Sequence, residues 1–290
     1  MPLCNGAFNS MLRKTRVVNG RTIRRSEWPF LVSLHYLHSF PFTSQTHMKH
    51  LCGGALINPR YVITAGHCVG FFKELQDVNN WNVVLGEHNQ YLPDLGEQVI
   101  KPEKFFIHPG FQPFSTFTLQ NDLALIKLNK DADLSTSFVN TIPLEEKQDI
   151  KELTQCEIGG WGQVSSEPYG YGMYIPLKTN LYVVNNDTCF EAYESLTYDV
   201  GDLRMVIDDN VLCAGVPYAL NSKPDVDHGY NDACNGDSGS PLVCPTGPNK
   251  EYHLVGLVSA GKGCGTGRFP GIYTKVSQYI DWINDIIAKE

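Results

Sequence analysis

The chain carries the stretch CNGDSGSPLVC at residues 234–244, in which Ser238 lies between glycines and two cysteines enclose the whole segment. Small neighbours let a substrate carbonyl approach a serine hydroxyl, and a tight turn can direct the N–H groups of Gly236 and Ser238 toward one point. The stretch therefore has the features of a nucleophile with its own anion-binding turn.

Two segments upstream supply the groups that such a nucleophile needs. TAGHC at residues 64–68 contains His67, and NDLALI at residues 121–126 contains Asp122. A hydroxyl, an imidazole base and an orienting carboxylate form the set that nucleophilic acyl transfer requires. A lone serine in a glycine-rich turn is usually only a turn, but three such residues in three matching contexts favour a catalytic set.

Composition excludes several other classes of protein. The 290 residues include 23 Lys and Arg against 31 Asp and Glu, so the formal charge is −8, which argues against a nucleic-acid or anionic-membrane partner. No stretch approaches the roughly 18 uninterrupted apolar residues of a membrane-spanning helix. Nine cysteines without a CxxC pair indicate an oxidising compartment rather than a zinc ribbon. Residues 1–16 lack the apolar core of a secretory signal, which we expect either upstream or removed.

Short apolar runs separated by Gly, Pro and Asn predict an antiparallel β protein. These runs are Phe30–Leu34, Tyr61–Thr64, Val83–Leu85, Leu123–Leu128, Leu181–Val184, Leu254–Ser259 and Gly271–Val276. One helix is predicted at residues 276–288, where apolar residues recur at three- and four-residue spacing. The polar stretch Leu134–Leu153 is interpreted as a connection between two β units.

TAGHC, NDLALIKL and CNGDSGSPLVC, in the order His67, Asp122, Ser238, closely resemble the chymotrypsin/trypsin family of secreted serine proteases. The similarity runs from about Val17 to Ile287. It implies an all-β fold of two antiparallel six-stranded β-barrels with a C-terminal helix. The barrels would occupy about residues 29–130 and 150–275 of a peptidase domain at 17–290, and residues 1–16 would be an activation peptide or the remnant of an upstream region.

The resemblance also implies the catalytic roles. Ser238 would attack the scissile carbonyl, His67 would take and return the proton, and Asp122 would orient the imidazole. The backbone N–H groups of Gly236 and Ser238 would form the oxyanion hole. No cofactor is required for this chemistry.

A substrate pocket is expected around Asp232, six residues before Ser238, where trypsin-like members carry an acid. A carboxylate there would pair with an Arg or Lys side chain. Gly261 and Gly271 would keep the pocket open, and Ser259 with Gly261 would pair with the substrate backbone. Ala260 stands where the family usually has tryptophan, an aromatic residue that walls the subsites beyond the primary pocket.

The sequence Arg16-Val17-Val18-Asn19-Gly20 resembles the activation junction of family zymogens. Cleavage after Arg16 would free the amino group of Val17 to pair with Asp237. An activating protease is therefore an expected partner.

Family positions imply four disulfides: Cys52–Cys68, Cys156–Cys244, Cys189–Cys213 and Cys234–Cys264. Cys4 is left over, and its partner is not defined. The resemblance also marks a calcium loop with Glu87, Asp94 and Glu97 as carboxylates and Asn89 and Leu92 as carbonyl donors. An acidic solvated loop is the equally weighted alternative. Asn186 begins a glycosylation sequon.

The sequence thus predicts a secreted trypsin-like serine endopeptidase, made as a zymogen and cutting after Arg or Lys. Long segments at Ser39–His50, between Cys68 and Leu85, and at Val216–Tyr230 are expected to narrow access, which favours limited proteolysis of particular proteins. A digestive trypsin of broad range and a non-catalytic protease-like binding protein are the alternatives. Protein or peptide substrates and protein inhibitors are the expected partners, with no nucleic acid and no membrane span.

Overall fold

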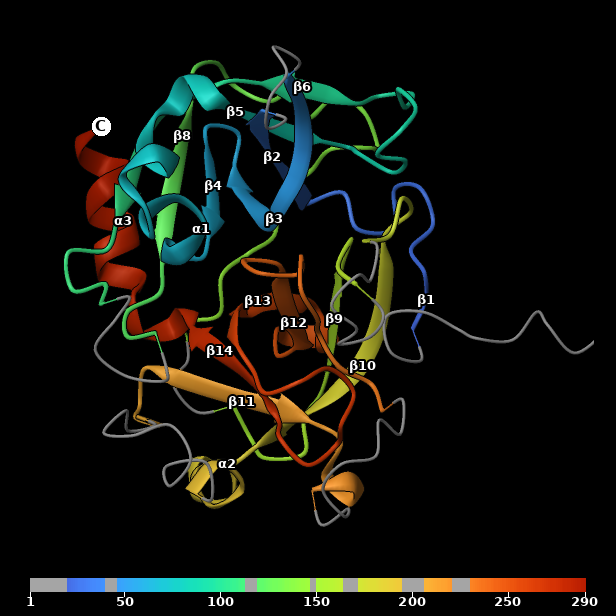
Figure 1. Cartoon of the computed structure of the whole chain (residues 1–290), viewed down its shortest axis with the longest axis vertical. Helices are drawn as coiled ribbons and strands as arrows, with labels where there is room; N and C mark the ends of the chain where they lie inside the picture. Colours follow the sequence, from blue (N-terminus) through green and yellow to red (C-terminus); the bar gives the residue numbers. More distant parts are fainter. Residues whose placement is uncertain are drawn as a thin grey trace, which may run out of the picture.

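The computed structural model describes residues 20–39, 46–112, 119–146, 150–163, 172–194, 206–220 and 230–290. Within these ranges two curved antiparallel sheets stack one above the other (Figure 1). This confirms the predicted all-β fold, and each predicted run overlaps a strand.

The N-terminal sheet has seven strands in the order β6-β5-β2-β3-β4-β8-β7. Their bounds are β2 (Leu31–Ser39), β3 (Thr46–Asn58), β4 (Tyr61–Thr64), β5 (Trp81–Leu85), β6 (Gln98–Ile100), β7 (Pro102–Ile107) and β8 (Ala124–Leu128). The strand count exceeds the predicted six. The two edge strands β6 and β7 are consecutive in the chain and separated only by Lys101, and β7 begins at Pro102, which has no N–H to continue a ladder. One bent strand therefore counts as two, and the sheet curls until its two edges meet at Lys101.

The C-terminal sheet closes into a barrel. Its order is β1-β10-β11-β14-β13-β12-β9, and an additional β9–β10 pairing joins the ends of the six longer strands. The bounds are β1 (Arg21–Thr22), β9 (Gln155–Gly160), β10 (Leu177–Val184), β11 (Val211–Gly215), β12 (Pro241–Pro245), β13 (Tyr252–Ala260) and β14 (Gly271–Lys275). The short β1 pairs with β10 outside the barrel, so the N-terminal segment is attached to the C-terminal sheet.

Each sheet encloses its own apolar core, and a third apolar cluster lies between them. The third cluster joins Leu31 and Leu125 of the first sheet to Val243 and Leu257 of the second. The predicted C-terminal helix is present as α3 (Ile280–Lys289), after the 3-10 turn η6 (Val276–Gln278). It buries Ile283 in this cluster and lies beside β8 in Figure 1, so it ties the end of the chain back to the first sheet.

The remaining helices within the described ranges are short. They are α1 (Gly66–Gly70), α2 (Asn186–Glu194) and the 3-10 turns η1 (Lys73–Gln76), η2 (Val78–Asn80), η4 (Pro217–Ala219) and η5 (Pro248–Lys250). The sequence did not predict α2. The expected long loop at Ser39–His50 is largely strand, because β2 and β3 continue as a hairpin in which Ser39 pairs with Thr46. The tip of this hairpin and most of the Val216–Tyr230 segment lie outside the described residues.

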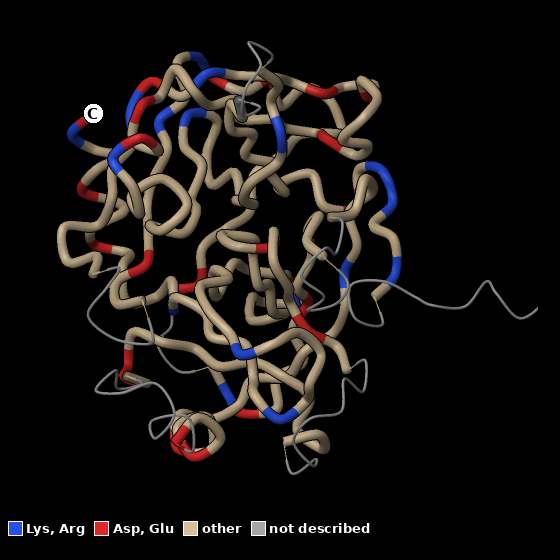
Figure 2. The backbone as a smooth tube through the Cα atoms, in the orientation of Figure 1, with Lys and Arg blue, Asp and Glu red and all other residues tan. Residues whose placement is uncertain are grey.

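Four disulfides join the pairs that the family resemblance implied, Cys52–Cys68, Cys156–Cys244, Cys189–Cys213 and Cys234–Cys264. Acidic and basic residues are scattered over the described backbone (Figure 2). Among the described residues, no helix has both the length and the apolar composition needed to cross a bilayer.

Candidate active site

His67 and Asp122 are brought together by two neighbouring strands. β4 ends at Thr64, and the chain turns directly into α1, which carries His67. β8 begins just after Asp122 and pairs with β4 in a register that sets Thr64 opposite Ala124. The end of one buried strand therefore faces the start of the other, and the two side chains meet there.

Asp122 is completely buried, with 0% of its surface exposed, and each of its carboxylate oxygens accepts hydrogen bonds. The backbone N–H of His67 donates to Oδ1 at 2.7 Å. Nδ1 of His67 and the hydroxyl of Ser259 donate to Oδ2 at 2.7 and 2.6 Å. Because Nδ1 carries the hydrogen in this contact, Nε2 of the neutral ring is left with its lone pair, as a general base requires.

The surroundings of His67 act on its pKa in opposite directions. Burial of the ring favours the neutral form and lowers the pKa, whereas the charge of Asp122 and the hydrogen bond to it raise the pKa. The net pKa lies above the ordinary value. Asp122 therefore stabilises the imidazolium that forms when His67 accepts a proton.

Ser238 lies in a turn that contacts the strand leading to His67. Gly239 has a positive φ of 75°, and a Cβ at this residue would lie 2.2 Å from Oγ1 of Thr64. Only glycine permits this approach of the turn to β4. The N–H of Gly53 on β3 also donates to the carbonyl of Ser238 at 2.8 Å. The serine backbone is thus fixed against the sheet that carries His67.

A second histidine, His50, fixes the same turn. Its Nε2 donates to the carbonyl of Gly236 at 2.9 Å, and its Nδ1 accepts from the hydroxyl of Ser33 at 2.8 Å. Burial lowers the pKa of His50 to about 4, so the ring is neutral at neutral pH. The sequence did not assign this role, because 186 positions separate His50 from Gly236.

A cavity of about 290 Å³ lies where the sequence predicts the substrate pocket. The residues predicted for it all line it, together with the serine: Asp232, Ser238, Ser259, Gly261 and Gly271. A Cβ at Gly261 would meet nothing within 4 Å, so the wall is open there.

Asp232 is a buried carboxylate at this cavity. Its oxygens accept the N–H groups of Ala233 and Gly265, each at 2.9 Å. Burial raises the pKa of Asp232 to about 7, despite these two bonds, with a smaller contribution from the charge of Asp237. A cation entering the cavity would favour the ionised form of this group.

Asp237 is also buried, and the residue it was expected to meet lies outside the described ranges. Its carboxylate accepts the N–H of Gly162 at 2.8 Å and the N–H of Cys234 at 3.0 Å. Burial raises its pKa to about 6. Arg16, Val17 and Cys4 all lie outside the described residues.

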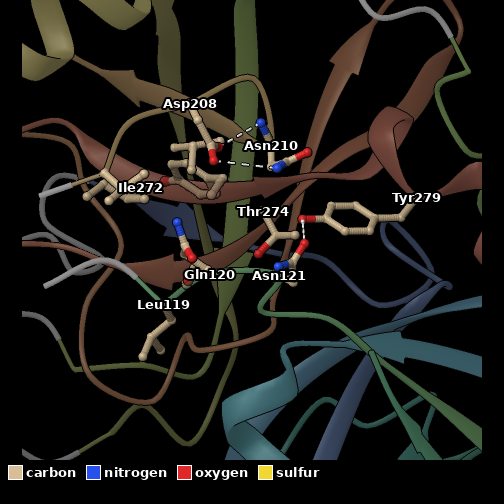
Figure 3. Close-up of a pocket in the computed structure, with 12 residues that line it drawn as sticks. Leu119, Gln120, Asn121, Asp208, Asn210, Ile272, Thr274 and Tyr279 are labelled. Carbon is tan, nitrogen blue, oxygen red and sulfur yellow. Dashed lines mark hydrogen bonds between the residues drawn. The ribbon is translucent and has the colours of Figure 1, made fainter. Parts of the chain in front are cut away.

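A second, smaller pocket is lined by residues that include Asn121, Thr274 and Tyr279 (Figure 3). Thr274, which lines it, donates its hydroxyl to the carbonyl of Asp122 at 2.8 Å, and Tyr279 donates to Oδ1 of Asn121 at 3.2 Å. The volume is about 10 Å³, which is room for about one water molecule and not for an organic ligand. The hydrogen bond from Thr274, which lines this pocket, fixes the backbone of Asp122.

The acidic loop (residues 87–97) brings its three carboxylates together. Ligand oxygens of Glu87, Asp94 and Glu97 lie within 4.8 Å of one another. Asp94 is already paired, because the guanidinium of Arg25 contacts Oδ1 and the N–H groups of His88 and Asn89 donate to Oδ2. The carbonyl of Asn89, one of the expected donors, accepts the N–H of Leu92 at 3.0 Å. The negative charge of this loop suits a calcium ion, but both carboxylate oxygens of Asp94 already contact groups of the protein.

The side chain of Asn186, the expected glycosylation acceptor, is partly buried at the start of α2. Its Nδ2, the atom that would carry a glycan, donates to the carbonyl of Asp208 at 2.9 Å. Glycosylation there would have to break this bond.

The fold and the site together define a serine hydrolase built on two β units. The family model described as Trypsin matches residues 17–283. The chain is 31% identical to a tryptase of Mus musculus, an alignment that covers 99% of this chain and 94% of that protein. It is 33% identical to a trypsin of Xenopus laevis and 35% identical to trypsin I-P1 of Gallus gallus, with 94% of this chain and 91% and 90% of those proteins covered.

The chain therefore belongs to the trypsin family of serine proteases. It is a serine endopeptidase, a class that acts on protein substrates and needs no cofactor for catalysis.

Proposed function

We propose that this endopeptidase cuts after Arg and Lys. The observation that carries the proposal is the position of Asp232, a buried carboxylate in the same cavity as Ser238. Within the described part of the chain, the two oxygens of Asp232 accept hydrogen bonds from backbone N–H groups and form no ion pair with a cation. An arginine or lysine side chain would supply that cation, and an apolar side chain would leave the charge uncompensated.

The proposed chemistry assigns one task to each residue. Nε2 of His67 takes the proton of the Ser238 hydroxyl as the oxygen attacks the scissile carbonyl, and returns it to the leaving amine. Asp122 keeps the hydrogen on Nδ1 and stabilises the imidazolium. The N–H groups of Gly236 and Ser238 receive the oxyanion, each donor lowering the barrier by roughly 3 kcal/mol. Water then repeats the sequence on the acyl-enzyme.

We also propose that the chain is a zymogen, processed by another protease after Arg16. Support comes from Asp237, which is buried and, among the described residues, accepts hydrogen bonds only from backbone N–H groups. A free amino group at Val17 would supply the missing cation, and the paired carboxylate would hold the turn that contains Gly236. The peptidase domain would then begin at Val17.

Secretion and limited proteolysis are further parts of the proposal. Four disulfides are typical of an oxidising compartment, which favours an extracellular location. The long β2–β3 hairpin supports restricted access, and we expect selected protein substrates and protein inhibitors rather than general digestion. Similar rates of degradation for many unrelated proteins would contradict this part.

A substrate-library profile of the chain cleaved after Arg16 tests the proposal. We expect arginine and lysine before the scissile bond to exceed all other residues by at least about a hundredfold, the discrimination expected for a lost buried charge pair. Asp232→Asn should remove this preference while fluorophosphonate labelling of Ser238 persists. A wild-type profile that prefers aromatic or small residues would overturn the specificity and leave the peptidase activity in place.

A further inference from the structure

We propose that Arg25 takes the place of a calcium ion at the acidic loop, so that the N-terminal segment of the chain holds this loop without metal. The carboxylate of Asp94 is buried, with 1% of its side chain exposed, and it forms an ion pair with the Arg25 guanidinium. A carboxylate buried to this extent needs a positive partner. The chain supplies that partner from a residue 69 positions away.

The second carboxylate of the loop also has a partner within the chain. Oε2 of Glu87 lies 3.1 Å from Nε2 of His35 on β2, and 3% of the Glu87 side chain is exposed. Glu97 accepts the N–H of Asp94 at 3.0 Å. Asp94 and Glu97 therefore already accept hydrogen bonds from the protein, Glu87 lies beside His35, and a calcium ion would have to displace Arg25 to reach Oδ1 of Asp94.

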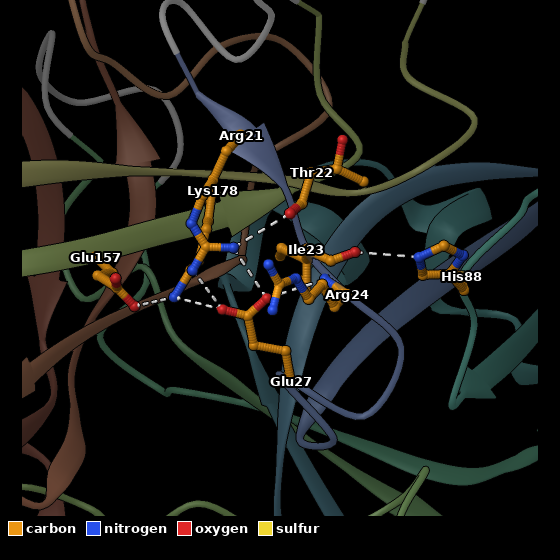
Figure 4. A network of polar contacts seen from close by, with 8 residues as sticks. All are labelled: Arg21, Thr22, Ile23, Arg24, Glu27, His88, Glu157 and Lys178. Carbon is orange, nitrogen blue, oxygen red and sulfur yellow. Dashed lines mark hydrogen bonds and ion pairs between the residues drawn. The ribbon is translucent and has the colours of Figure 1, made fainter.

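The contact between the N-terminal segment and the loop extends beyond one ion pair. Nε2 of His88 lies 3.0 Å from the carbonyl of Ile23, and this pair is visible at the right of Figure 4. The backbone N–H of His88 donates to Asp94 at 2.8 Å. His88 thus contacts both Asp94, the ion-pair partner of Arg25, and the backbone of Ile23, two positions before Arg25.

The segment that delivers Arg25 is itself anchored on the C-terminal barrel. Glu27 pairs with Arg21 at 2.5 Å and with Lys178 of β10 at 3.1 Å, and Lys178 also pairs with Glu157 of β9 at 2.5 Å (Figure 4). β1 adds backbone pairing with β10. Residues 21–27 therefore connect the acidic loop of the first sheet to the second barrel, which is a task that a metal bound within the loop could not perform.

Two consequences follow for the loop. Its stability should depend on Arg25 and should be indifferent to calcium. Loss of Arg25 should make the backbone of the loop more mobile. A protease should then cut the loop faster at its exposed residues Tyr91, Leu92 and Leu95. Neither consequence requires the proposed Arg/Lys specificity or the zymogen step.

The test uses the full chain with Ser238→Ala, so that self-digestion cannot occur and the outcome is independent of activity. Arg25→Gln is compared with Arg24→Gln, which removes the neighbouring exposed arginine. Melting temperatures are measured with EDTA, with millimolar calcium chloride and with magnesium chloride, and cleavage by chymotrypsin within residues 87–97 is followed by mass spectrometry.

We expect the parent protein and Arg24→Gln to melt at the same temperature with EDTA and with calcium. Arg25→Gln should melt roughly 2–6 °C lower in EDTA, should be cut faster within the loop, and should recover part of both losses with calcium but not with magnesium. Arg25→Lys, which keeps the charge but loses the planar fork, should lie between the parent and Arg25→Gln.

Two results would overturn the proposal. One is a parent protein whose melting temperature rises with calcium and falls with EDTA. The other is an Arg25→Gln protein that matches Arg24→Gln in both melting temperature and loop cleavage. If Arg25→Gln does not fold, the parent and Arg25→Lys decide the matter: a calcium response of the parent, or an Arg25→Lys protein that melts at the parent's temperature and is cut no faster within the loop, contradicts the substitution of metal by arginine.

Discussion

Asp122 shows how much of the site depends on single hydrogen bonds. Its carboxylate is buried with no direct contact to solvent, and its oxygens accept from His67 and Ser259. The carbonyl of the same residue accepts from Thr274. Both strands β13 and β14 of the second barrel thus reach across to position an acid of the first sheet.

Asp122→Asn tests this arrangement through pH. The pKa of His67 is raised by the charge of Asp122 and by its hydrogen bond, so activity should be lost as the pH falls through this raised pKa and His67 becomes protonated. Without the charge, burial alone acts and lowers the pKa. We expect kcat to fall by roughly 10⁴-fold and the acid limb of kcat/KM to move to lower pH.

Ser259→Ala is the matched control, because it removes a hydrogen bond to Asp122 and keeps the charge. It should cost about tenfold in kcat/KM and leave a clear acid limb. An Asp122→Asn enzyme with the wild-type acid limb would contradict the role given to this carboxylate.

The pocket acid gives a second pH prediction. The pKa of Asp232 is about 7 in the ligand-free protein, and an amidine binds the ionised carboxylate. Below this pH a proton must leave before the cation binds, so the affinity for benzamidine should fall by about tenfold per pH unit. Equilibrium titration with a fluorescent benzamidine on the Ser238→Ala protein measures this, and an affinity that is equal at pH values well below and above 7 would disprove it.

The sequence identified the residues of the site far better than their contacts. His67, Asp122, Ser238 and Asp232 lie in short segments whose neighbours mark them. The His50–Gly236 and Arg25–Asp94 contacts join positions 186 and 69 apart, and only the folded sheets bring them together. Ser259 was predicted to pair through its backbone, and its hydroxyl bond to Asp122 is visible only in three dimensions.

Strands and helices could be predicted where the pattern of apolar residues extended over enough positions. The strands with continuous apolar runs, such as Tyr61–Thr64, and the amphipathic α3 agree with the sequence pattern. The helix α2 was missed because over nine residues it buries only Cys189 and Tyr193, and two apolar positions do not define a period. The outer part of the β2–β3 hairpin was predicted as a loop because residues 39–50 contain Phe40, Pro41, Phe42 and several hydroxyl side chains, a composition typical of loops.

Ala260, the last residue of β13, can be tested by substitution. Ala260 packs only a methyl group against the cluster that contains Ile272 and Phe269, next to the open wall at Gly261. Ala260→Trp would cover this apolar surface. We expect activity on a single-residue arginyl amide to change by less than about threefold, and preferences two to four residues before the scissile bond to change by about tenfold, the effect of one partly buried aromatic contact.

Longer peptide amides that differ only at those upstream positions provide the measurement. The single-residue amide is the internal control, because it does not extend beyond the primary pocket. Equal profiles for Ala260→Trp and the wild type would show that this surface does not select substrates.

At the scale of the whole molecule, the two sheets must be fixed relative to each other, because His67 and Ser238 belong to different ones. The apolar cluster between the sheets, the helix α3 and the segment 21–27 all perform this task. The proposed activation step adds a contact within the second unit, between the new amino terminus and Asp237.

This step predicts loss of activity in alkali. A free α-amino group ordinarily has a pKa near 8, and pairing with the buried Asp237 should raise it. As the pH rises through the raised pKa the amine loses its charge, the carboxylate loses its partner, and the turn at Gly236 should relax. Activity of the cleaved enzyme should therefore fall on the alkaline side.

Arg16→Gln is the control for activation, because the activating protease would not cut it. The uncut protein should show at most about 1% of the activity of the cleaved enzyme, and Asp237→Asn should be inactive even after cleavage. Equal activity before and after cleavage would contradict the zymogen proposal.

The central claim is that Ser238 is the nucleophile of this endopeptidase once the chain has been cut after Arg16. Labelling with a fluorophosphonate, followed by mass spectrometry of the peptide that spans residues 234–244, tests it most directly. We expect one adduct on Ser238 in the cleaved protein, lost on His67→Ala and blocked by benzamidine. A cleaved, folded protein without an adduct at Ser238, or with the adduct on another serine, would contradict the account.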